Sequence, residues 1–89
     1  MAALDGSWDV RRVGGFLPPL LGVGKTIDGN RGHTTFGPVR VGFRVEGLTL
    51  HYTGLLRGLE DALVPDGEGF AGRCYLAGRE LGRFELRRP

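Results

Sequence analysis

The chain has 89 residues, a net charge of +2 at pH 7 and one cysteine, Cys74. This length is enough for one modest hydrophobic core, while a lone cysteine excludes an internal disulfide and a cysteine-based zinc site. No segment reads as a membrane helix or a secretory signal. We therefore expect one domain over residues 1–89, in the cytoplasm, with no membrane partner, no metal and no cofactor.

The first predicted strand begins near Gly6-Ser7-Trp8. Because side chains alternate between the two faces of a strand, Trp8 and Val10 share an apolar face that must point inward. Arg12 follows Val10 onto this inner face unless a bulge near residues 13–15 changes the register. A glycine two residues before the tryptophan permits close approach of a neighbouring backbone.

Two segments after this strand need separate interpretations. Residues 16–21 include Pro18-Pro19 and cannot form a central strand, so we expect an apolar crossover loop that acts as a lid over one barrel end. Gly22-Val23-Gly24-Lys25-Thr26 ends like a phosphate-binding loop, but proline stands at position 19, where that motif requires glycine. We interpret it as a loop that enters a strand.

The remaining chain shows period-two alternation between turn sequences, most clearly at Val39–Glu46, where every odd residue is apolar. Asp28-Gly29-Asn30 has the composition of a tight hairpin turn. Leucines between residues 55 and 63 follow helical spacing, but Gly58 and Pro65 favour a turn followed by a strand from about Leu59. The predicted strands lie at 25–27, 31–36, 39–46, 48–52, 59–64, 70–76 and 82–87.

About eight short antiparallel strands with at most one short helix are typical of a sandwich or a barrel. We predict an all-β fold, a small up-and-down meander that closes into a barrel. Gly6-Ser7-Trp8 resembles the G-x-W signature of lipocalins and related calycins. This resemblance implies that the tryptophan lies across the closed end of the barrel and that a late arginine packs on it; Arg83 and Arg87 are the candidates.

An eight-stranded barrel has an interior that is filled by side chains or holds one small ligand. Polar groups on its inner face are therefore the candidate site residues. By alternation Tyr52 accompanies Leu50, and Asp61 accompanies Leu63. A buried Arg12 would need an anionic partner, either Asp61 or a ligand carboxylate. The candidate ligand-binding residues are Arg12, Phe43, Leu50, Tyr52 and Asp61.

The sequence leaves the activity open. His51 is expected to face solvent, and Ser7 faces outward, so no serine–histidine–acid arrangement can be argued. We expect a protein that binds a small hydrophobic or amphipathic molecule, with a carboxylate as one option. One alternative is a barrel enzyme of the isomerase or cyclase type that uses Tyr52, Arg12 or a histidine.

The other alternative is a barrel that binds nucleic acid or protein through its arginines. Eleven of the twelve basic residues are arginine. They are interleaved with acidic residues along the chain, which argues against a nucleic-acid partner because such proteins cluster their basic residues. A homodimer that covers an edge strand or residues 16–21 remains an option.

Overall fold

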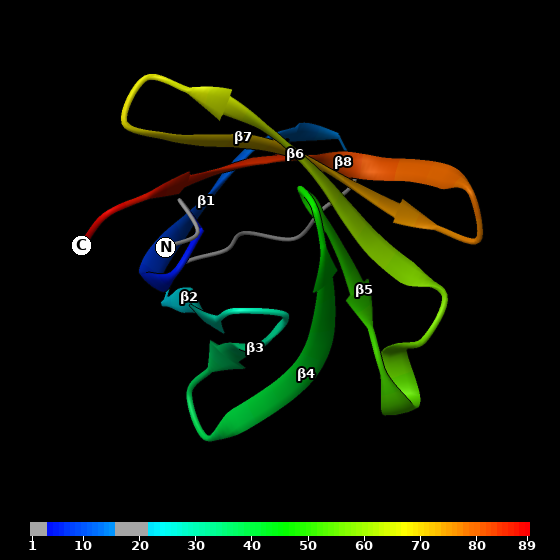
Figure 1. The fold of residues 1–89 in the computed structure, drawn as a ribbon. Helices are drawn as coiled ribbons and strands as arrows, with labels where there is room; N and C mark the ends of the chain where they lie inside the picture. The colour runs from blue at the N-terminus through cyan, green and yellow to red at the C-terminus, as the bar shows by residue number, and fades with distance from the viewer. Residues whose placement is uncertain (1–3, 16–21) are drawn as a thin grey trace.

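A computed structural model describes residues 4–15 and 22–89, so the predicted loop at residues 16–21 lies outside the described part. Its strands are β1 (Gly6–Gly15), β2 (Val23–Asp28), β3 (Arg31–Phe36), β4 (Val39–Glu46), β5 (Thr49–Tyr52), β6 (Leu59–Asp66), β7 (Gly69–Leu76) and β8 (Arg79–Arg87). Each strand pairs antiparallel with the next, and β1 also pairs with β8. The result is a closed up-and-down barrel, as predicted (Figure 1).

The predicted turns form where glycine allows a left-handed backbone. Gly29 and Gly67 have φ values of 66° and 61° at the tips of the β2–β3 and β6–β7 hairpins, which L-residues with a side chain rarely adopt. A 3₁₀ turn at Gly54–Leu56 is the single helical element of the described residues, and β6 begins at Leu59. The prediction of a turn followed by a strand is confirmed.

The core lies inside the barrel and follows the alternation of the strands. Directly opposed residues of an antiparallel pair lie on the same face. If one residue points inward, its partners on the two adjacent strands therefore point inward as well. The buried apolar residues are Leu4, Trp8, Val10, Ile27, Phe43, Leu50, Tyr52, Leu63, Phe70, Cys74, Phe84 and Leu86. Among the described residues, no helix is long and apolar enough to cross a membrane.

Trp8 is buried near the start of β1. Its side chain is 2% exposed, its Nε1 donates to the Leu4 carbonyl at 2.8 Å, and its ring meets Phe70 edge to face at 5.5 Å. Arg88 stacks on the indole, with Cζ 3.7 Å from the ring centroid. The expected tryptophan–arginine contact is thus present, but it is made by the residue that follows β8.

The two arginines expected to make this contact lie elsewhere. Arg87 forms ion pairs with Asp66 at 3.0 Å and with Glu85 at 3.2 Å. Arg83 is exposed and lies opposite Gly14 in the β1–β8 ladder. The prediction that Arg83 or Arg87 packs on Trp8 was wrong. Both residues lie within β8, whereas the arginine that contacts the indole is the residue after the strand ends.

The opposite end of the barrel carries an inward ring of apolar residues that are not fully covered. Val23 pairs with Phe36, and Phe36 pairs with Val39, so the three share a face; Leu59 pairs with Leu76 in the same way. Phe36 and Val39 are 58% and 54% exposed. We call this ring the apolar rim; it consists of Val23, Phe36, Val39, Val41, Leu59 and Leu76.

Candidate functional site

Lys25 lies inside the barrel, which the sequence did not lead us to expect. It stands between Val23 and Ile27 on the inward face of β2, opposite Trp8 on β1 and Thr34 on β3. Only 4% of the residue is exposed. A buried ammonium group needs an anionic partner and further hydrogen bonds to offset its desolvation.

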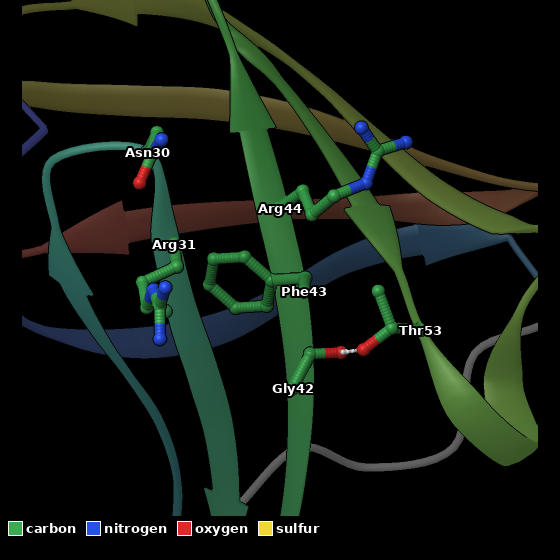
Figure 2. Close-up of a pocket in the computed structure, with 7 residues that line it drawn as sticks. Asn30, Arg31, Gly42, Phe43, Arg44 and Thr53 are labelled. Atoms are coloured by element: carbon green, nitrogen blue, oxygen red, sulfur yellow. Dashed lines mark hydrogen bonds between the residues drawn. The ribbon is translucent and has the colours of Figure 1, made fainter.

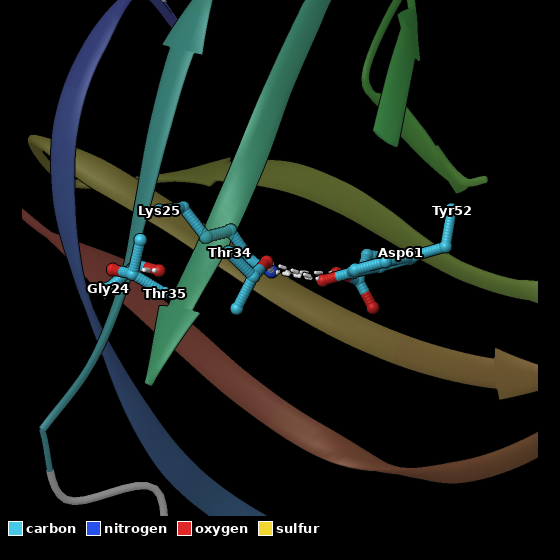
Figure 3. A network of polar contacts seen from close by, with 6 residues as sticks. All are labelled: Gly24, Lys25, Thr34, Thr35, Tyr52 and Asp61. Atoms are coloured by element: carbon cyan, nitrogen blue, oxygen red, sulfur yellow. Dashed lines mark hydrogen bonds and ion pairs between the residues drawn. The ribbon is translucent and has the colours of Figure 1, made fainter. Parts of the chain in front are cut away.

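Three other strands supply these partners, the adjacent β3 and the more distant β5 and β6. Lys25 Nζ lies 3.1 Å from Asp61 Oδ2, donates to Thr34 Oγ1 at 2.8 Å, and donates to Tyr52 Oη. Tyr52 Oη in turn donates to Asp61 Oδ2 at 3.1 Å. Figure 3 shows these contacts converging from β2, β3, β5 and β6. We call Lys25, Thr34, Tyr52 and Asp61 the polar cluster.

Aromatic rings surround the ammonium group. Nζ of Lys25 lies 5.4 Å, 5.1 Å and 5.6 Å from the ring centroids of Phe43, Tyr52 and Phe84, distances at which the negative ring faces attract a cation. The Phe84 ring lies against Gly72, where a Cβ would come within 2.4 Å of its Cζ. Glycine at position 72 therefore leaves the space that the Phe84 ring occupies beside Lys25.

The environment keeps these groups protonated at neutral pH. Burial lowers the pKa of Lys25, but Asp61 and Tyr52 raise it by more, so the net shift is upward. Burial also raises the pKa of the Tyr52 phenol. Burial and the Asp61 carboxylate raise the pKa of the Cys74 thiol to about 12. The cluster therefore contains an ammonium and a phenol, with a thiol beside it, and neither the lysine nor the cysteine is in its nucleophilic form.

Most predicted site residues lie where alternation placed them. Phe43, Leu50, Tyr52 and Asp61 are all buried on the inner face, and Phe43 meets Tyr52 edge to face at 5.4 Å. Three of the four surround or belong to the polar cluster. Leu50, which is fully buried, contributes to the apolar core beside them.

Arg12 is the exception: the prediction that it is buried is wrong, and Asp61, one of the two partners considered for it, pairs with Lys25 instead. The Arg12 side chain is exposed and donates to the Gly15 carbonyl at 2.7 Å. Arg12 pairs with Phe84, and the expected bulge follows it, between Arg12 and Gly14. It thus lies on the inner side of the sheet but near the end of β1, where the guanidinium reaches Gly15, the last residue of the strand. The buried cation that pairs with Asp61 is Lys25, not Arg12.

Two signals in the sequence could have identified Lys25. Its position continues the alternation of Val23 and Ile27, and it is the only lysine in a chain whose other basic residues are all arginine. The alternation is obscured because glycines flank it in a segment that resembles the end of a phosphate-binding loop. The strand at Val23–Asp28 confirms that this segment is no such loop.

A cavity of about 370 Å³ opens on the barrel wall, lined by Asn30, Arg31, Gly32, Gly42, Phe43, Arg44 and Thr53 (Figure 2). Arg31 and Arg44 are directly opposed across β3 and β4, and their side chains point away from each other. Acidic residues balance them, because Glu46 lies 3.6 Å from Arg44 and Asp28 lies opposite Arg31.

His51 lies on the outer face of β5, as expected. Its Nε2 is 3.4 Å from Glu46 and its Nδ1 is 4.0 Å from Glu60. The described part of the chain contains no group of three or more metal-binding side chains placed to hold an ion. No family model matches the chain, and comparisons with curated proteins and with solved structures found no significant match.

Proposed function

We propose that this protein binds a small apolar or amphipathic molecule at the apolar rim, with the polar cluster as the floor of the site. The observation that carries the proposal is the set of large apolar side chains on the inner face of one barrel end that remain half exposed. Sites for small molecules are mostly apolar and contain a few well-placed polar groups. The rim and the cluster together have this composition.

The energetic argument rests on Phe36, Val39 and Leu76. Each has about half of its surface exposed although pairing places it on the inner face. Full burial of such a side chain contributes about 1.5–3 kcal/mol, and about half of each remains to be covered. Covering one therefore contributes roughly 1 kcal/mol, and a ligand that covered all three would gain roughly three times as much. Ordinary solvent-facing positions of the same strands carry polar residues such as Arg40 and Thr35.

The calycin resemblance supports the same proposal. A closed up-and-down barrel and an arginine stacked on Trp8 are the two features that the G-x-W motif implies. We therefore propose a calycin-like barrel, in which one end is sealed and the other receives the ligand. An eight-stranded barrel has room for one small molecule.

The protonation states favour binding over catalysis. The raised pKa values of Lys25, Tyr52 and Cys74 leave a charged ammonium, a neutral phenol and a neutral thiol. A Schiff-base lysine or a thiolate nucleophile would require the opposite shifts. The enzyme alternative that uses Tyr52 as a base is therefore the weaker proposal.

A fluorescence titration with the neutral apolar probe N-phenyl-1-naphthylamine tests this function. We expect saturable enhancement at one site, and roughly tenfold weaker binding for Phe36→Asp and Val39→Asp, because a carboxylate must then be desolvated at the rim. The matched control is Val64→Asp, since Val64 is 59% exposed but lies on the outer face of β6. Absence of saturable binding by the folded protein, or equal losses in Val64→Asp, would contradict the proposal.

A further inference from the structure

We infer that the floor of the site selects ligands that donate a hydrogen bond, such as an alcohol, over ligands that bear a carboxylate. This inference rests on the proposed binding function and adds the polar group that the ligand carries. The evidence is a count of the hydrogen-bond donors and acceptors in the polar cluster.

All donors of the Lys25 ammonium are used within the cluster. Its three N–H groups have three acceptors, namely Thr34 Oγ1, Tyr52 Oη and Asp61 Oδ2. A ligand carboxylate therefore finds no unused N–H on the one buried cation of the described residues. It would have to displace one of these partners.

The hydroxyl groups are committed in the same way. The hydroxyl proton of Tyr52 points to Asp61 Oδ2, which lies 3.1 Å away. If the proton pointed elsewhere, the lone pairs of the phenol oxygen would face the negative carboxylate and be repelled by it. Tyr52 and Thr34 oxygens are 2.8 Å apart, so Thr34 must supply the proton of that hydrogen bond. Thr34 consequently accepts from Lys25, donates to Tyr52, and keeps one lone pair.

The unused capacity of the cluster consists of acceptors. Thr34 is its half-buried member and pairs with Val41 of the apolar rim, so its lone pair is the one nearest the proposed ligand. An O–H or N–H group can donate to it, whereas a carboxylate or an ether cannot. The Lys25–Asp61 ion pair also leaves the cluster without net charge, so the cluster has no excess positive charge to attract an anion. The guanidinium of Arg12, at the same end of the barrel, already donates to the Gly15 carbonyl.

The test compares three ligands of equal chain length: decan-1-ol, 1-methoxydecane and decanoate. Each competes with N-phenyl-1-naphthylamine for the wild-type protein at pH 8. We expect the alcohol to bind about fivefold more tightly than the ether, the difference that one neutral hydrogen bond makes, and decanoate to bind most weakly. Decanoate binding as tightly as the alcohol, or an ether equal to the alcohol, would overturn the inference.

Variants at adjacent positions localise the effect. Thr34→Val should abolish the preference for alcohol over ether, while Thr34→Ser, which keeps the hydroxyl, should preserve it. Thr35→Val is the control, because Thr35 lies on the outer face and donates to the Gly24 carbonyl. Preference retained in Thr34→Val would also overturn the inference. Failure of the probe and of every ligand to bind would instead reject the proposed function itself.

Discussion

The guanidinium of Arg88 lies over the indole ring of Trp8, with Cζ 3.7 Å from the ring centroid, and its Nη1 donates to the Ser7 carbonyl at 3.4 Å. The residue after the last strand thereby covers a residue near the start of the first. Together with Leu4 and Phe70, it shields the indole from water.

Replacing the indole should have a large effect on stability. Trp8→Ala removes a fully buried aromatic side chain, and such truncations cost about 3–5 kcal/mol. Urea denaturation at pH 7, followed by circular dichroism, measures the loss. A change below about 1 kcal/mol would mean that the indole does not close the barrel.

Removing the Arg88 side chain should lower stability less than removing the indole, and should affect Trp8 more than removal of another arginine does. Arg88→Ala is expected to cost about 1 kcal/mol or less, the range for exposed cation–π contacts, and to make Trp8 fluorescence more sensitive to acrylamide. Arg83→Ala is the matched control, because Arg83 is exposed and lies beside Gly14 on β1. Equal quenching in both variants would contradict the stacking.

The Lys25–Asp61 pair should show the asymmetry of buried ion pairs. Lys25→Met leaves the Asp61 carboxylate buried without its cation and is expected to cost about 3–5 kcal/mol. The double variant Lys25→Met/Asp61→Leu should recover much of this loss, because neither charge is then left alone. The free energy of unfolding from urea titrations measures both, with Arg40→Met at an exposed site as the control. Single and double variants of equal stability would refute the coupling.

Stability should fall at alkaline pH. The Cys74 thiol has a pKa of about 12 in the folded protein against 9.0 when exposed, so above pH 9 the unfolded chain binds fewer protons than the folded one. The free energy of unfolding must then decrease as pH rises. Lys25 and Tyr52, whose pKa values are raised from 10.5 and 10.0, add to the loss above pH 10.

Urea midpoints measured from pH 7 to pH 11 test this dependence. Cys74→Ala should flatten the fall of the urea midpoint between pH 9 and 10, where the other two groups of the unfolded chain are still at least half protonated. A wild-type midpoint that rises over this interval would contradict the sign. Native Cys74 should also react slowly with Ellman's reagent at pH 8, because the thiolate is the reactive species.

Alternation along the strands was sufficient to predict the barrel and most of its interior. Phe43, Tyr52 and Asp61 were identified because each lies two residues from another inward apolar side chain. The same rule gives the face of a residue but not its depth along the barrel axis. Arg12 shows this limit, since its partner Phe84 is buried while Arg12 itself is exposed near the end of β1.

The contacts of the site could not be read from the sequence because they join separate strands. Lys25 and Asp61 meet through a register that spans four consecutive ladders, and one slipped residue in any of them would turn a partner outward. Likewise, nothing in the pattern of β8 indicates that the chain continues past Arg87 to place Arg88 on the indole.

The pairing of β1 with β8 has a consequence for assembly of the fold. Seven ladders join strands that are neighbours in sequence, and one joins positions as distant as Asp9 and Arg87. The hairpins can form from local contacts, but pairing β1 with β8 must close a loop that contains almost the whole chain. Until it does, β1 and β8 present two unpaired edges. At high protein concentration during refolding, these edges can pair with the edges of another copy of the chain. Strand-exchanged dimers should therefore increase with protein concentration during refolding and be absent when refolding is dilute.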